Sequence, residues 1–224
     1  MGKLLRLLAG LLALLLVAML VSYFWVRAGL EELDVAARQQ VGGNYFQSDY
    51  GSIAYTRHGS AEAPPVVLVH GFSTPKFVWQ QVVPILVDAG YQVLTYDHLG
   101  RGFSERPAGP YDDELYRTEL SSLIQELGLV TPLTLVGYSM GGANVVDFAV
   151  ENPSLIAQLV LIAPAGYMGQ TGARSWLWSP VLGEWFTTVF GRRYARDTIA
   201  NKVAEGLAPP HMLEQFDEQA SYHG

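Results

Sequence analysis

The chain lacks cysteine entirely, which excludes disulfide bonds, thiol catalysis and metal sites with cysteine ligands. It is also poor in positive charge: 14 lysines and arginines stand against 21 aspartates and glutamates, for a formal net charge of −7. No cluster of basic residues provides the electrostatic footprint that nucleic acids require, so we expect no nucleic-acid partner. A length of 224 residues suffices for one domain with a sizeable core, with or without an appendage.

Charge is absent altogether from Leu7 to Val26, a leucine-rich run that ends in Tyr23-Phe24-Trp25. A helix of this length spans about 30 Å, the thickness of the hydrocarbon core of a bilayer, and aromatic side chains suit its interface. The run therefore favours a membrane anchor, with a cleaved signal peptide or a buried soluble helix as alternatives. Lys3 and Arg6 precede the run and favour a cytoplasmic N-terminus with an extracytoplasmic domain.

The pattern of apolar residues predicts four regions along the chain. We expect a cytoplasmic stub and transmembrane anchor over residues 1–27, a tether over 28–43, an α/β core over 44–165 and a helical region rich in aromatic residues over 166–224. Within the core, apolar runs predict strands near residues 45–48, 53–57, 65–69, 91–96, 133–136 and 159–162. Helical periodicity covers residues 78–88, 112–127 and 143–151. The last four strands alternate with helices, which predicts a parallel sheet of buried strands.

The most specific motif is Gly137-Tyr138-Ser139-Met140-Gly141, a G-x-S-x-G sequence between an apolar run and a helix start of small residues. This pattern is typical of a sharp strand-to-helix turn that exposes one serine. We expect Ser139 to adopt a strained backbone conformation, and a side chain at Gly137 or Gly141 to collide with the crowded turn. An incidental serine in an ordinary turn is the alternative.

Further motifs follow the other predicted strands: His70-Gly71-Phe72-Ser73, the loop from Asp97 to Ser104, and Leu161-Ile162-Ala163-Pro164. With the G-x-S-x-G motif, they make residues 45–165 resemble the α/β-hydrolase superfamily, and within it the cap-bearing serine esterases and monoacylglycerol-lipase-like members. The resemblance implies the α/β-hydrolase fold, a mostly parallel sheet with a helical cap, here preceded by a transmembrane helix. Residues 44–165 would be the N-terminal part of the core of this fold, and residues 166–224 would be its helical cap region. It implies neither a metal nor an organic cofactor.

The resemblance also implies roles for individual residues. Ser139 would be the nucleophile that forms an acyl-enzyme, activated by a histidine base. The backbone N–H groups of Met140 and Phe72 would form the oxyanion hole. His70 and Gly71 would shape the loop that carries Phe72.

The loop after the strand at 91–96 contains an adjacent acid and base, Asp97 and His98, which invites a catalytic interpretation. The resemblance favours a structural role instead, with Asp97 holding backbone N–H groups of its loop. Arg101 is expected to pin this loop as an ion-pair partner.

The remaining members of a catalytic triad are not evident. The expected order is serine, then an acid, then histidine. After Ser139 the sequence offers His211 and His223, neither of which follows a strand-like run. Asp147 lies two helical turns beyond Ser139, about 12 Å away by rise, too far to orient a histidine at the serine. We therefore expect the chain to end inside or just after its cap, as a fragment or a natural truncation, without the triad acid and base.

Together these features predict a membrane-anchored serine hydrolase that acts on carboxylic esters. Its expected partners are the membrane and a small-molecule ester, lipid-derived esters included. Trp176, Trp178 and Phe186 would line an apolar acyl pocket or simply pack between cap helices. Cleavage of amides or carbon–carbon bonds stays open, because the fold alone does not determine the reaction. From another class, a non-catalytic binding module is the alternative that the missing acid and base favour.

Overall fold

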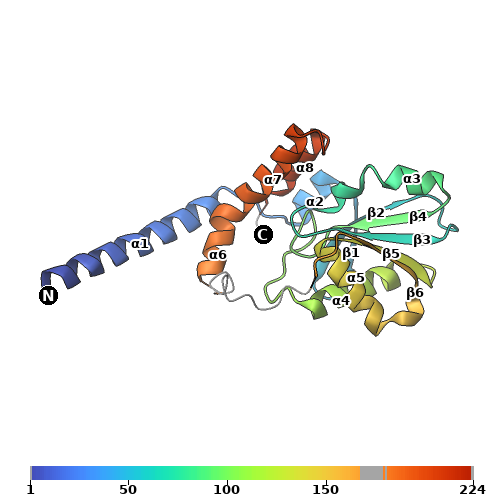
Figure 1. The fold of residues 1–224 in the computed structure, drawn as a ribbon, viewed down its shortest axis with the longest axis horizontal. Coiled ribbons are helices and arrows are strands. Elements are labelled where there is room, and N and C mark those ends of the chain that lie inside the picture. The colour runs from blue at the N-terminus through green and yellow to red at the C-terminus, as the bar shows by residue number, and fades with distance from the viewer. Residues whose placement is uncertain (1, 167–178, 180, 223–224) are drawn as a thin grey trace.

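A long apolar helix projects from a separate α/β unit in the computed structural model, which describes residues 2–166, 179 and 181–222 (Figure 1). Helix α1 (Gly2–Ala28) has no buried residue. It is long and apolar enough to cross a membrane, a test that a signal sequence near an N-terminus also passes. Length and composition therefore fit both a membrane span and a signal sequence.

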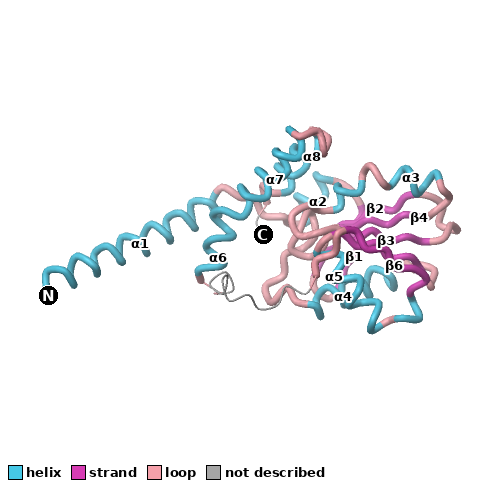
Figure 2. The backbone as a smooth tube through the Cα atoms, viewed as in Figure 1, coloured by secondary structure: helices cyan, strands magenta, loops and turns pink. Residues whose placement is uncertain are grey.

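Six strands form one sheet in the order β1-β2-β4-β3-β5-β6 (Figure 2). The strands are β1 (Asn44–Ser48), β2 (Gly51–His58), β3 (Pro65–Val69), β4 (Gln92–Tyr96), β5 (Leu133–Tyr138) and β6 (Ile156–Ile162). Strand β2 pairs antiparallel with both β1 and β4, whereas β4, β3, β5 and β6 run parallel. The predicted, mostly parallel sheet is confirmed. Its parallel strands all end at one edge, where the sequence motifs follow them.

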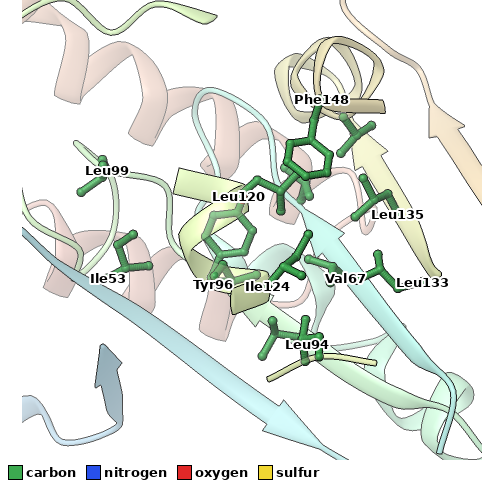
Figure 3. Packing of buried hydrophobic residues seen from close by; sticks show 14 of the residues in the cluster. Ile53, Val67, Leu94, Tyr96, Leu99, Leu120, Ile124, Leu133, Leu135 and Phe148 are labelled. Atoms are coloured by element: carbon green, nitrogen blue, oxygen red, sulfur yellow. The ribbon is translucent and has the colours of Figure 1, made fainter. Parts of the chain in front are cut away.

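Helices α4 (Asp113–Glu126) and α5 (Met140–Glu151) cover one face of this sheet. Figure 3 shows Phe148 of α5 and Leu120 of α4 directed at the sheet residues Val67 and Leu135, all of them buried. The side chains of β3 alternate, so Val66 and Leu68 belong to a second cluster with Trp79 and Val83 on the other face. Strand β3 is therefore buried on both faces, as its continuous apolar run predicts.

The helix predicted over residues 78–88 is wrong in extent. The chain instead forms a short 3₁₀ helix, η1 (Lys76–Trp79), followed by α3 (Val83–Asp88). Pro84 lies in the first turn of α3. A proline has no N–H to donate and its ring collides with the preceding turn, so it is tolerated at a helix start and breaks a longer helix. The proline was a local signal that periodicity alone overlooked.

The burial expected for residues 159–162 is also wrong. They lie in β6, as predicted, but their side chains are 38–43% exposed. Among the described residues β6 is the edge strand, paired only with β5. An apolar run identifies a strand suited to a sheet interior, but it does not supply the neighbours that bury it.

Residues 28–43 are more structured than the expected tether. They contain helix α2 (Val35–Val41), whose N-cap Asp34 accepts a hydrogen bond from the N–H of Ala37 at 2.8 Å. Leu33 packs with Ala54 and Phe103 of the α/β unit. This segment therefore has a docked helix of its own.

The chain after Pro164 is helical where it is described. Its elements are α6 (Leu182–Phe186), the π-helical turn η4 (Thr187–Gly191), α7 (Arg192–Ala204) and α8 (His211–Gln219). Phe77 of η1 packs with Ile199 of α7 and Phe216 of α8. These two helices thus lie over the segment that follows β3. Trp176 and Trp178 lie outside the described residues, and the division into domains stays a prediction.

Candidate active site

Ser139 lies at the turn between β5 and α5 with a φ of 53° and a ψ of −117°. A positive φ is strained for a residue that has a side chain. A Cβ at Gly137 would lie 2.5 Å from the carbonyl oxygen of Gly141, and one at Gly141 would lie 2.4 Å from the carbonyl oxygens of Val69 and His70. The requirement for glycine at both positions is therefore steric. The turn is too tight for any larger residue without a shift of backbone.

Hydrogen bonds hold the backbone of Ser139 from both sides. Its N–H donates to the carbonyl of Ile162 at 3.1 Å, and its carbonyl accepts from the N–H groups of Gly142 and Ala165 at 3.0 and 2.7 Å. Strand β6 and the start of α5 thus share in fixing the turn. The hydroxyl of Ser139, by contrast, has no hydrogen-bond partner within the described ranges, and the residue is half-buried.

The loop after β3 touches this serine. A Cβ at Gly71 would lie 3.0 Å from the Cβ of Ser139, so the loop approaches as closely as glycine permits. The neighbouring His70 is fully buried, and its Nε2 accepts from the N–H of His98 at 2.9 Å. Its Nδ1 must therefore carry the proton, which it donates to the carbonyl of Gly71 at 2.7 Å. Burial lowers the pKa of His70 well below 6.5, so the ring is neutral.

Two backbone donors remain available in the segments that meet at Ser139. The N–H of Phe72 has no acceptor in the described part of the chain. Met140 is the first residue of α5, where the N–H has no intrahelical acceptor. Both donors therefore belong to segments that adjoin Ser139.

Arg101 holds Phe72 in place, a role that the sequence analysis missed. Its Nε donates to the carbonyl of Phe72 at 2.9 Å, and its guanidinium lies 4.5 Å from the centre of the phenyl ring. The predicted ion pair of Arg101 is wrong: no carboxylate within the described ranges pairs with it. The two residues are 29 positions apart, and no local pattern signals such a contact.

The ion-pair partner of this loop is Lys76 instead. Its backbone N–H donates to Oδ1 of Asp97 at 2.8 Å, and its Nζ contacts Oδ2 at 2.6 Å. Oδ2 also accepts from the N–H of Phe103 at 3.2 Å. The carboxylate fills the space beside Gly102, where a Cβ would lie 2.2 Å from Asp97 Cγ. Asp97 thus joins the loops after β3 and β4.

Asp97 and His98 do not act on each other as an acid–base pair. The Nδ1 of His98 bonds to Oε1 of Glu119 in α4, and the other carboxylate oxygen accepts from the N–H of Leu99 at 2.6 Å. The side chains of His98 and Glu119 are fully buried. Each member of the adjacent pair therefore has its own structural partner, which disfavours the catalytic alternative for this dipeptide.

No histidine of the described residues makes a hydrogen bond to Ser139. His211 bonds through Nε2 to the amide oxygen of Gln80 at 2.8 Å, and His223 lies outside the described residues. Asp147 pairs with Arg117 at 2.6 Å. A cavity of about 640 Å³ lies between α8 and α3, and Ser139 is not among its lining residues. Within the described ranges, no three histidine, aspartate or glutamate side chains are grouped to hold a metal ion.

Comparison with known proteins identifies the family. The family model described as the alpha/beta hydrolase fold matches residues 64–218. The chain belongs to the α/β-hydrolase family. Its curated relatives include Lipase 1 of Psychrobacter immobilis, 34% identical over 51% of this chain and 36% of the relative. Another is an sn-1-specific diacylglycerol lipase of Xenopus tropicalis, 35% identical over 51% of this chain and 36% of the relative.

Solved structures agree with this assignment. An esterase from Exiguobacterium antarcticum aligns with a TM-score of 0.51 and 30% identity over 55% of this chain and 46% of the other. A bromoperoxidase from Bacillus anthracis aligns with a TM-score of 0.51 and 32% identity over 55% and 45%. The chain spans about a third of the length of the two curated lipases. Within the family the named activities differ, so membership establishes the fold and leaves the reaction to the site.

Proposed function

We propose that this protein is a serine hydrolase in which Ser139 attacks carboxylic esters. The observation that carries the proposal is the φ of 53° at Ser139, held by glycines on which a Cβ would collide with backbone. Strain of this kind persists only where surrounding structure enforces it, and it is concentrated at functional sites. Here it presents a hydroxyl without a hydrogen-bond partner, within the described ranges, beside two unpaired backbone donors.

The proposed chemistry proceeds through an acyl-enzyme. The oxygen of Ser139 bonds to the ester carbonyl carbon, its proton passes to a base, and the alcohol leaves with a proton when the carbon–oxygen bond breaks. The N–H groups of Phe72 and Met140 stabilise the negative carbonyl oxygen, each by about 3–4 kcal/mol. Water then releases the acid and restores the serine. No described histidine is placed to be the base, and serine with oxyanion donors alone supports only weak catalysis.

That observation favours a second candidate, a non-catalytic binding module on the same scaffold. Within the described ranges His70 and His98 bond to buried partners and His211 bonds to Gln80, while His58 lies in β2 opposite Val93, at the start of β4. A serine without a base would still offer a hydroxyl and two N–H donors to a carbonyl or carboxylate ligand. Such a module would bind esters or acids without turning them over.

We further propose that α1 anchors the domain in a membrane and that the substrate is a lipid-derived ester. The whole of α1 is free of buried side chains, and Trp25 and Phe24 near its end are exposed, as expected for an interface. Two of the curated relatives are named as lipases. The basic residues Lys3 and Arg6 favour an N-terminus in the cytoplasm and a domain on the other side.

Labelling with a fluorophosphonate probe tests the nucleophile directly. Such a probe phosphonylates an activated serine, so we expect labelling of the parent protein and its loss in Ser139→Ala. Ser154→Ala, at an exposed serine after α5, is the matched control and should label like the parent. A parent protein that resists labelling, yet binds fatty acid or ester in a Ser139-dependent way, would support the binding module and contradict the enzyme.

A further inference from the structure

The segment from Val181 to Tyr194 packs against the end of α1, although about 160 residues separate the two in sequence. The indole N–H of Trp185 donates to the hydroxyl of Ser22 at 2.9 Å. The hydroxyl of Tyr23 contacts Oε1 of Glu184 at 2.5 Å. Figure 1 shows α6 beside the last turns of α1 and away from the sheet. The position of this segment is therefore tied to the helix and less to the α/β unit.

This segment exposes an apolar stripe. Leu182, Phe186, Phe190 and Tyr194 recur every four residues, a spacing that places them on one side of successive helical turns. Their exposed fractions run from 36% for Phe186 to 76% for Tyr194, and Val181 directly before α6 is 70% exposed. The rings of Phe186 and Phe190 lie 5.3 Å apart, so the two middle members of the stripe are in contact. Contiguous exposed apolar surface of this kind marks an interaction site.

The last turns of α1 have the composition of a membrane boundary, and the apolar stripe lies beside them. Ser22 and Tyr23 lie in the last part of the apolar run, next to the exposed Trp25 and before Arg27. Aromatic residues followed by a basic residue are typical of the level at which a spanning helix leaves the hydrocarbon core. Glu184 and Trp185 are hydrogen-bonded to Tyr23 and Ser22, which lie at that level. Their neighbours in the stripe therefore lie at the same depth as the membrane boundary, wherever α1 spans.

The charges around the stripe fit a lipid surface as well. Arg192 and Arg193 follow η4 and are exposed, and Arg27 is exposed at the end of α1. The carboxylate of Glu184 accepts a hydrogen bond from the hydroxyl of Tyr23, which offsets part of the free energy lost when the carboxylate leaves water. An amphipathic helical segment with apolar residues and adjacent arginines is the composition that binds in the interface of a bilayer with anionic lipids.

We propose that residues 181–194 form a second membrane contact, which inserts the stripe into the same bilayer leaflet that α1 leaves. The contact rests on the proposed anchoring by α1 and makes it more specific. It places the cap region, and not the α/β unit, against the lipid.

The absence of cysteine makes the test clean, since one introduced cysteine is the only site of thiol labelling. Three exposed valines give matched positions: Val181 before α6 is 70% exposed, Val150 in α5 is 71% exposed and Val21 in α1 is 59% exposed. Val181→Cys, Val150→Cys and Val21→Cys are each labelled with an environment-sensitive fluorophore in the full chain. The proteins are reconstituted in vesicles of phosphatidylethanolamine and phosphatidylglycerol that contain phosphatidylcholine with a nitroxide on its acyl chain.

We expect the nitroxide lipid to quench the labels at Val21 and Val181 several-fold more strongly than the label at Val150. If the label at Val21 is quenched but the label at Val181 is quenched no more than the one at Val150, the second contact is overturned and the anchor stands. No quenching at Val21 would refute the anchor and the second contact together. A Val181 label shielded from water but not quenched by lipid would indicate a protein partner or a second copy, and would overturn the proposal as well.

Discussion

The loops around Ser139 and the helices after Pro164 are built in opposite ways. Around Ser139, fully buried polar side chains such as Asp97 and His70 bond to backbone groups, and glycines permit contacts that any Cβ would prevent. Over residues 181–222, large apolar side chains such as Leu182 and Phe190 are exposed, and the Arg196–Asp217 ion pair lies at the surface.

The difference shows where each region obtains its geometry. The loops at the strand ends are positioned by their own short contacts, so they are preorganised whatever surrounds the protein. Among the helices, α7 and α8 pack on Phe77 of η1, whereas α6 and η4 take their position from contacts with α1. We therefore expect matched substitutions to be costly in the first region and tolerated in the second.

The sharpest contrast is between two glycine-to-alanine substitutions. A Cβ at Gly141 would lie 2.4 Å from two carbonyl oxygens, whereas at Gly191 in η4 the nearest atom is 3.7 Å away. Gly141→Ala should lower the free energy of unfolding by at least about 3 kcal/mol, because the backbone must shift. Gly191→Ala should be neutral or stabilise by up to about 1 kcal/mol, because alanine favours helix. Urea denaturation of both variants measures this; equal stabilities would contradict the contrast.

A second contrast compares two ion pairs. Asp97 is buried and joins Lys76 to the N–H of Phe103. Asp97→Asn should lower the free energy of unfolding by about 3 kcal/mol, because it leaves the ammonium of Lys76 without its counter-charge in a mostly buried site. Asp217→Asn breaks the exposed pair with Arg196 and should leave the urea midpoint unchanged within error. If both variants lost a similar free energy of unfolding, burial would not explain the difference between the two regions.

The sequence predicted the first region better than the second for a physical reason. The β-branched run at 65–69 and the G-x-S-x-G motif express local geometry, strand and turn, that the chain carries wherever it folds. The exposed β6, and the contact of Arg101 with Phe72, are tertiary: each depends on which segments lie nearby. Of the differences, only the helix break at Pro84 had a local signal.

The candidate site divides in the same way. Its serine and glycines are recognisable because steric demands restrict which residues can stand there. Lys76 could not be recognised as the partner of Asp97, because a lysine 21 residues away has no pattern that points to the carboxylate. The hydrogen bond from Trp185 to Ser22 is harder still to predict, since it joins residues that are 163 positions apart.

Acid should destabilise the first region through His70. The unfolded state titrates near the ordinary pKa of 6.5, whereas burial lowers the folded pKa well below it. The stability that depends on neutral His70 is therefore complete above pH 6.5 and is lost as the pH falls toward the folded pKa, by up to about 1.4 kcal/mol per pH unit. His70→Gln should flatten this dependence in urea titrations, and the control His211→Gln in α8 should keep it. An unchanged slope in His70→Gln would refute the assignment.

The smallest expected effect on stability is that of a substitution at Arg101. This substitution distinguishes the positioning of Phe72 from the stability of the fold. Lysine lacks the planar fork that bonds to the Phe72 carbonyl while stacking on the Phe72 ring. Arg101→Lys should change the free energy of unfolding by less than about 1 kcal/mol. It should nevertheless slow fluorophosphonate labelling of Ser139 several-fold, because the N–H of Phe72 is no longer held beside the serine. Arg117→Lys, at the pair with Asp147, should leave the labelling rate unchanged. If both variants label like the parent, the N–H of Phe72 contributes nothing at Ser139, and oxyanion stabilisation would rest on Met140 and the start of α5.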